Sequence, residues 1–171
     1  MFKNKWTYLG FIILGIFLFS AIFAPYLAPE DPYQISLIKQ LAEPSADEFF
    51  GRDINGSDIF SRLLFGARIS LVISVIVVAI SGFIGITLGL ISGYYGGWID
   101  TFLMRVVDIL LAFPPLLLAI ALVAVLGPSL SNVVIALTVL SWVPFARLVR
   151  GQVLSLKQRN YILAAKTSGQ I

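Results

Sequence analysis

Long stretches without a charged side chain dominate the sequence. Three of them, residues 6–29, 69–99 and 109–146, are 24, 31 and 38 residues long. A helix needs about 20 apolar residues to cross the roughly 30 Å hydrocarbon core of a bilayer. The third stretch exceeds one crossing, and Gly127-Pro128-Ser129 divides it, because glycine and proline mark a turn. The pattern therefore predicts four transmembrane helices in an all-α, polytopic membrane helix bundle.

The first apolar helix is expected to run from Trp6 to Pro29, behind Lys3 and Lys5. A cleaved signal peptide is the competing interpretation, since basic residues precede an apolar core. The apolar run is long and leads into a proline-containing segment without a small-residue cleavage site. We therefore expect an uncleaved first helix.

Turn residues delimit the later helices, and the sequence GYYGGW separates the second from the third. Pro114 and Pro115 lie inside the third helix, where each lacks an amide hydrogen and clashes with the preceding turn. We expect a kink at these two prolines. The expected bounds are Ile69 to about Ser92, about Thr101 to Leu126, and Leu130 to Phe145.

Composition agrees with a membrane protein and excludes several classes of chemistry. The chain is 58% apolar and only 12% charged, whereas soluble domains are about 45–50% apolar and about 25% charged. Its lack of cysteine and histidine excludes a disulfide framework, a cysteine nucleophile and a histidine-dependent triad. The net charge of +3 is too small to predict nucleic-acid binding.

The distribution of charge predicts the orientation. Residues 1–5 carry two basic side chains, and residues 147–171 carry five with no acid. Residues 30–68 carry four basic and seven acidic side chains. Because basic residues stay on the cytoplasmic side, both termini are expected there and 30–68 outside. This gives a first segment (1–29), an extracytoplasmic segment (30–68) and a core (69–171) with a cytoplasmic tail (147–171).

Two patterns within the helices suggest packing contacts. Gly85, Gly89 and Gly93 repeat every four residues, so they line one helix face that another helix can approach closely. That helix belongs either to the same chain or to a second subunit. Arg105 and Asp108 are three residues apart and can form an interfacial ion pair, with a proton relay as the alternative.

The polar segments hold few groups suited to a ligand. Asp53-x-Asn55-x-Ser57 has the spacing of a calcium loop, but its glycine is misplaced and no bidentate glutamate follows. We predict no metal site. No phosphate-binding Gly-x-x-x-x-Gly-Lys sequence is present, so we expect no ATP hydrolysis by this chain.

The tail contains a short predicted helix without a core of its own. Asn160 is suited to cap it, and Gly169 is suited to end it in a left-handed turn. Ala164 and Ala165 are small, so a partner can approach closely. This partner is either the membrane or another protein.

The segment from Trp142 to Gly169, WVPFARLVRGQVLSLKQRNYILAAKTSG, resembles the coupling segment of ABC-importer permeases. That motif is usually Glu-Ala-Ala, three residues, then Gly; here Leu163 stands at the Glu position. GRDINGSDIFSRLLFGARISL and GYYGGWIDTFLMRVVDILLAFPPLLLAIALVAVLGPSLSN resemble other stretches of the dipeptide/oligopeptide/nickel group. The group usually has Gly-Thr-Asp and then Gly-Arg-Asp in the outer segment, whereas this chain has Gly51-Arg52-Asp53 and then Gly56-Ser57-Asp58.

The resemblance implies a type I importer permease with six transmembrane helices, of which this chain has four. It looks like the N-terminal part, truncated within the coupling segment. The implied assembly has a second permease subunit, two ATP-binding subunits that use ATP and Mg, and an extracytoplasmic substrate-binding protein. It lies in a bacterial or archaeal cytoplasmic membrane. The implied coupling residues are Tyr161, Ile162, Leu163, Ala164, Ala165 and Gly169; no cofactor is expected on this chain.

The resemblance leaves the cargo open between short peptides and nickel or another small solute. Without histidine or cysteine the chain offers no strong nickel ligand, which favours peptides. A truncated membrane remnant that no longer transports is a further alternative. A membrane-embedded enzyme would have only Asp100, Arg105 and Asp108, which lack a nucleophile or a metal.

Overall fold

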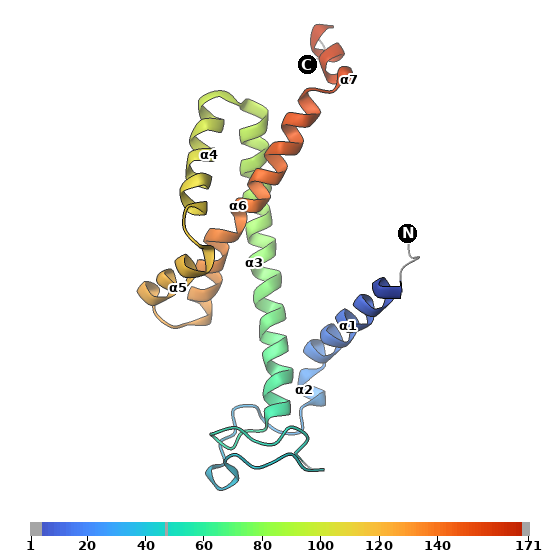
Figure 1. Cartoon of the computed structure of the whole chain (residues 1–171), viewed down its shortest axis with the longest axis vertical. Coiled ribbons are helices and arrows are strands. Elements are labelled where there is room, and N and C mark those ends of the chain that lie inside the picture. Colours follow the sequence, from blue (N-terminus) through green and yellow to red (C-terminus); the bar gives the residue numbers. More distant parts are fainter. Residues whose placement is uncertain (1–4, 47, 169–171) are drawn as a thin grey trace. The chain divides into compact units, whose positions relative to one another are not determined.

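The computed structural model describes residues 5–46 and 48–168, and these residues are almost entirely helical or in loops (Figure 1). Within them the only β-type pairing is an isolated bridge between Arg52 and Asp58. The chain divides into two compact units at Ser74, a residue inside one long helix. We describe each unit separately.

The first unit contains two helices before its loops. They are α1 (Lys5–Ile22) and α2 (Ala24–Leu27), and a 3-10 turn η1 (Leu37–Lys39) follows. Pro25 stands in the first turn of α2, where its missing amide hydrogen costs nothing, so the helix restarts after Ile22. Only 6% of the apolar window of α1 is buried within the chain. Such a surface requires lipid or another protein around it.

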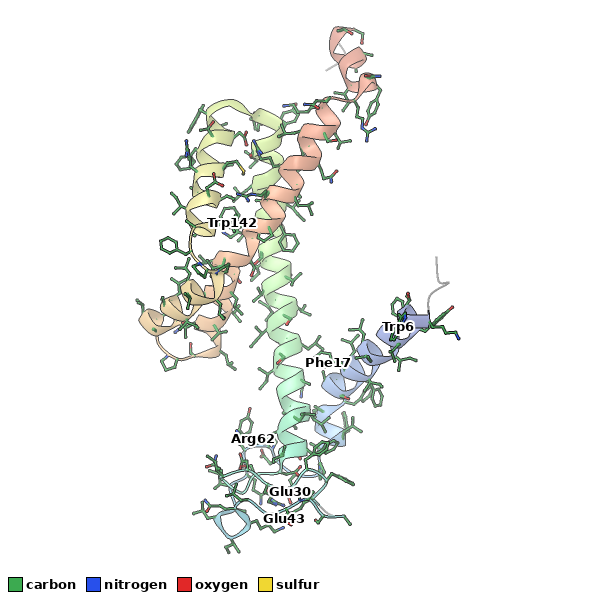
Figure 2. All side chains as sticks on the ribbon, viewed as in Figure 1. Trp6, Phe17, Glu30, Glu43, Arg62 and Trp142 are labelled. Atoms are coloured by element: carbon green, nitrogen blue, oxygen red, sulfur yellow. The ribbon has the colours of Figure 1, made fainter. Side chains whose placement is uncertain are left out.

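The loops of the first unit are organised around the buried guanidinium of Arg52. Its Nη2 donates to Glu30 Oε1 at 2.6 Å, its Nε to Glu48 Oε1 at 2.7 Å, and its Nη1 to the Gly56 carbonyl at 3.0 Å. Lys39 also pairs with Glu48 at 2.8 Å. Arg52 thus joins the three loop segments that carry Glu30, Glu48 and Gly56. Figure 2 labels Glu30. A buried charge is tolerated only when it is paired in this way.

Helix α3 (Ile59–Tyr95) begins earlier than we expected. Asp58 caps it, because its Oδ2 accepts from the Ser61 amide at 2.8 Å and from the Ser61 hydroxyl at 2.6 Å. The span expected from Ile69 is thus the continuation of a helix that begins ten residues earlier. The Asp53 carboxylate is also occupied, since it accepts from the amides of Asn55 and Ser57 and pairs with Arg62.

The described part of the second unit, up to Ser168, contains the rest of α3 and four further helices. Figure 1 shows α4 and α6 beside the C-terminal part of α3, with α7 after α6. The turn between α3 and α4 is shorter than GYYGGW, because only Gly96 separates the two helices, and Gly96 and Gly97 have φ values of 67° and 57°. The helices are α4 (Gly97–Leu111), α5 (Pro115–Leu126), α6 (Leu130–Lys157) and α7 (Asn160–Thr167).

At Pro114 and Pro115 the helix breaks completely. Helix α4 ends at Leu111, α5 begins at Pro115, and their axes differ by 85°. The described residues hold three helices long and apolar enough to cross a membrane, or four if this bent pair counts as one crossing. A proline inside a helix usually causes a kink, and two in succession end the helix here.

The turn between α5 and α6 is closed by polar side chains. Ser129 caps α6 by accepting from the Asn132 amide at 3.2 Å. The Asn132 side chain donates to the carbonyls of Leu126 and Gly127 at 2.8 and 2.9 Å. These bonds satisfy groups that a helix end leaves free. Helix α6 then continues to Lys157, twelve residues past the expected end at Phe145.

Helices α3 and α6 approach each other so closely that three glycine positions of α3 have no room for a side chain. A Cβ added to Gly89 would lie 2.6 Å from the Ala146 carbonyl oxygen, and one added to Gly93 would lie 2.7 Å from Val153 Cβ. At Gly85 it would clash with the Trp142 carbonyl. Figure 2 shows Trp142 on α6.

Gly89→Ala tests this close approach. We expect it to lower the melting temperature of the purified protein in detergent, because overpacking costs about 1–3 kcal/mol. This cost exceeds the gain in helix propensity of about 1 kcal/mol. Gly82→Ala is the matched control, since open space surrounds Gly82 in the same helix. Equal melting temperatures for the two variants would contradict the close contact.

The pH dependence of the loops tests the Arg52 network. Lys39 and Arg52 hold the pKa of Glu48 below its ordinary value of 4.5. The folded-state pKa is depressed, so this stabilisation is present above pH 4.5 and is lost as the pH falls through the folded-state pKa. We expect amide exchange in residues 42–58, corrected for its intrinsic pH dependence, to accelerate below pH 4.5. Glu48→Gln should flatten this profile, and an unchanged profile would contradict the network.

Candidate functional site

The predicted coupling segment forms a helix with one exposed face. Tyr161 is 65% exposed, and Ala164 and Thr167 are exposed on the same side, whereas Ile162 and Ala165 are partly covered. On a helical projection Ala164 lies at the centre of the exposed face. Leu163 is helical in its backbone, and Gly169 lies outside the described residues.

Side-chain hydroxyls close the end of α7. The Thr167 hydroxyl donates to the Ala164 carbonyl at 2.8 Å, and the Ser168 hydroxyl donates to the Ala165 carbonyl at 3.0 Å. The Ala164 carbonyl also accepts from the Ser168 amide at 3.0 Å, so these bonds close the last turn of the helix. On the exposed face of α7, Ala164 contributes only a methyl group.

A cluster of polar groups joins the helices that lead to α7. Arg150 of α6 makes a two-point ion pair with Asp100 of α4, with Nε–Oδ1 at 2.5 Å and Nη2–Oδ2 at 2.7 Å. The hydroxyl of Ser92, on α3, donates to the same Asp100 carboxylate at 2.5 Å. Ser92 is fully buried, and the Arg150 and Asp100 side chains are 30% and 18% exposed. One carboxylate thus connects three helices.

Lys157 adds a second connection between α6 and α3. Its Nζ donates to the carbonyls of Gly93 and Tyr94 at 3.2 and 2.6 Å. The same ammonium lies 5.7 Å from the centre of the Tyr94 ring. A cation at a helix C-terminus is favourable because free carbonyls and the helix dipole carry negative partial charge there.

The expected pair between Arg105 and Asp108 is replaced by a pair between helices. Asp108 Oδ1 accepts from Arg147 Nη2 of α6 at 2.7 Å, and no ion pair within 5–46 and 48–168 includes Arg105. Spacing along one helix makes a pair possible, but an arginine on the packed neighbour has the reach to compete for the carboxylate. The Arg147 and Asp108 side chains are 52% and 58% exposed, so the pair contributes little to stability.

The pairing of Asp100 with Arg150 was not predicted from the sequence. The sequence does contain a signal for this pair. Two consecutive antiparallel membrane crossings place the start of one beside the end of the next. Opposite charges at those two ends are therefore candidates for pairing.

The described residues hold no cluster suited to a metal ion. No group of three or more Asp and Glu side chains is arranged as a ligand set within them. The polar groups described above instead use their oxygen atoms to bind arginine, lysine and backbone amides. This arrangement positions helices and offers no reactive group.

Two family profiles match this chain. The profile described as "binding-protein-dependent transport system inner membrane component" matches residues 85–170, which include α4, α5, α6 and α7. The profile described as "N-terminal TM domain of oligopeptide transport permease C" matches residues 1–44. The first match thus covers both the polar cluster and the candidate coupling helix.

Curated relatives match almost the whole chain. A dipeptide transport system permease protein of Alkalihalophilus pseudofirmus is 47% identical over 98% of this chain and 55% of its own length. A dipeptide transport system permease protein of Bacillus subtilis is 44% identical over 98% of this chain and 52% of its own length. A glutathione transport system permease protein of Pectobacterium atrosepticum is 48% identical over 87% of this chain and 50% of its own length.

The chain spans about half the length of these relatives. Their identity to this chain lies far above the level at which a common fold is in doubt, and the transport profile covers half of the sequence. The chain therefore belongs to the family of binding-protein-dependent transport system inner membrane components.

Proposed function

We propose that this chain is part of the transmembrane permease subunit of an ATP-driven importer for dipeptides or oligopeptides. The observation that carries the proposal is the match to dipeptide and oligopeptide permeases over 98% of the chain. The geometry is consistent with this role, since polar side chains join apolar helices to one exposed terminal helix. A permease needs such a connection if a partner outside the membrane is to move it.

The exposed face of α7 is the proposed contact with an ATP-binding subunit. Ala164 allows a partner surface to approach closely, and Tyr161 offers a large apolar and polar side chain beside it. A helix face with one small and one aromatic side chain is suited to a groove in a protein. Closure of two ATP-binding subunits would displace α7 and with it the helices to which α6 is tied.

Charge supports an orientation with α7 in the cytoplasm. Arg147, Arg150, Lys157 and Arg159 lie in the last part of α6 and just after it. Tyr95 and Trp98 are 67% and 77% exposed at the α3–α4 turn, as expected for aromatic side chains at a membrane interface. If the bent pair makes one crossing, the number of crossings is even, which supports a cytoplasmic N-terminus as well.

The proposed assembly contains the partners that the family description implies. A second permease subunit would complete the pathway, and an extracytoplasmic binding protein would deliver cargo to the side of residues 30–58. ATP and Mg would be used by two separate ATP-binding subunits, and this chain would bind neither. Its own work is mechanical, because α7 receives movement and the helices change access to the pathway.

Ala164→Arg tests the contact with the ATP-binding subunit. We expect at least a tenfold loss of ATP-dependent dipeptide uptake into membrane vesicles, because a long charged side chain separates the two surfaces. The amount of permease in the membrane should not change, since Ala164 is exposed. Retained uptake would contradict the contact.

Ser155→Arg is the matched control for this substitution. Ser155 is exposed on α6, before the start of α7, and receives the same added side chain. We expect its uptake to remain within twofold of the unmodified protein. Equal losses for Ser155→Arg and Ala164→Arg would indicate a general effect of charge and would count against α7 as a specific contact.

Uptake of two radiolabelled cargoes tests the substrate class. Deleting the gene should lower import of a labelled dipeptide at least tenfold, and restoring it should recover import. Import of labelled Ni²⁺ should stay unchanged, because the chain has no histidine or cysteine to hold nickel. Loss of nickel import with normal dipeptide import would overturn the peptide assignment.

A further inference from the structure

We propose that Ser92, Asp100, Arg150 and Lys157 are positioning residues that form a polar clamp and make α3, α4 and α6 move together with α7. The clamp delivers displacement of α7 to the break between α4 and α5. This inference rests on the proposed function, because it concerns how movement that enters at α7 passes through the chain.

The clamp is needed because the α3–α4 turn does not hold α4 by packing. Gly96 and Gly97 have no side chains, and a Cβ added to either would meet nothing within 4 Å. Both have positive φ values, a conformation that glycine adopts without strain. Backbone hydrogen bonds from the Gly96 amide to the Ser92 carbonyl and from the Asp100 amide to the Gly96 carbonyl close the turn, but no side chain braces it. Contacts of α4 with α6 must therefore fix its direction.

Asp100 supplies that interaction from the first turn of α4. Its two oxygens bind the planar guanidinium of Arg150 at two points, which fixes the angle between the groups as well as their distance. The buried Ser92 hydroxyl binds the same carboxylate from α3. Displacement of α6 thus moves α4 directly and does not pass through the glycine turn.

Lys157 holds the end of α6 that is nearest to α7. It binds two carbonyls at the end of α3, and only Gln158 and Arg159 separate it from α7. Only these two residues therefore connect α7 to the clamp. A partner that moves α7 moves a body containing parts of three helices.

The next place where this body can bend is the α4–α5 break. Residues 112–114 lie between the two helices, whose axes differ by 85°. Two prolines remove amide donors there, so the backbone has fewer hydrogen bonds to resist a change of angle. Without the clamp, displacement of α6 would change the angle at the glycine turn. With the clamp, the same displacement changes the angle between α4 and α5.

The distance between α4 and α7 tests the clamp directly. The 171 residues contain no cysteine, so Phe102→Cys and Asn160→Cys accept two nitroxide labels at exposed positions. In the assembled transporter in proteoliposomes, we expect a narrow distance distribution with the same centre with and without ATP. Adding Asp100→Asn should at least double its width, because one of the two charges and the two-point pairing are lost.

Asp108→Asn is the matched control on the same helix. It removes the same charge from a pair with α6, but that pair is exposed and has no bond to α3. We expect its distance distribution to stay within a fifth of the original width. An unchanged width for Asp100→Asn, or equal broadening in both variants, would overturn the clamp.

Two further variants separate the clamp from a failure to fold. Ser92→Ala removes one bond from Asp100 and should broaden the distribution by an intermediate amount. Asp100→Arg with Arg150→Asp should restore it, since the Ser92 hydroxyl can also accept a hydrogen bond. The proposal would be overturned if Ser92→Ala left the width unchanged and the exchanged pair did not restore it.

The ratio of ATP hydrolysed to dipeptide imported is a second measurement. A residue with a purely structural role would not change this ratio. We expect Asp100→Asn to raise the number of ATP molecules hydrolysed per imported dipeptide at least tenfold, while the ATP-binding subunits still co-purify. An unchanged ratio would overturn the clamp as a coupling device. Absence of dipeptide import by the unmodified protein would instead overturn the proposed function, and the label distances would still decide the clamp.

Discussion

The contact between α3 and α6 is the interaction on which the second unit depends. Lipid tails are as apolar as the helix surfaces, so burial of apolar side chains alone does not hold two helices together in a membrane. Close approach of the backbones does, and Gly85, Gly89 and Gly93 permit it. Helix α5 then packs on α6, and α4 is joined to α6 by ion pairs. Helix α6 therefore organises the unit, and α3 fixes α6.

Two of the polar clusters lie where packing is weak and compensate for it. In the loops of the first unit, where few apolar side chains are buried, Arg52 joins Glu30 and Glu48. At Gly96 and Gly97 of the α3–α4 turn, where no side chain can pack, Asp100 and Arg150 supply a connection instead. Both arrangements use the planar guanidinium, which fixes direction better than the point charge of a lysine.

Features that depend on a single continuous segment could be predicted from the sequence. The charge-free runs predicted the apolar helices, and the spacing of three glycines placed them on one face. The charge-free run did not reveal the start of α3, because Arg62 and Arg68 stand in its first turns before the apolar part. The partner of Asp108 was beyond local reasoning, because Arg105 and Arg147 are both within reach and only the packing of α4 against α6 selects between them. The break at Pro114 was expected as a kink; its 85° angle depends on where α5 packs on α6.

The broken helix pair also constrains what can surround it. Helix α4 has 15 residues and α5 has 12, so each is only about 18–22 Å long and neither alone crosses a hydrocarbon core of about 30 Å. If the pair makes one crossing, its non-helical residues 112–114 lie at membrane depth. Backbone carbonyls without helical partners are not stable against lipid tails. The Pro114 carbonyl accepts from the Leu118 amide at 3.1 Å, so this requirement falls on residues 112 and 113. Water or the polar surface of another protein must therefore reach the carbonyls of these two residues.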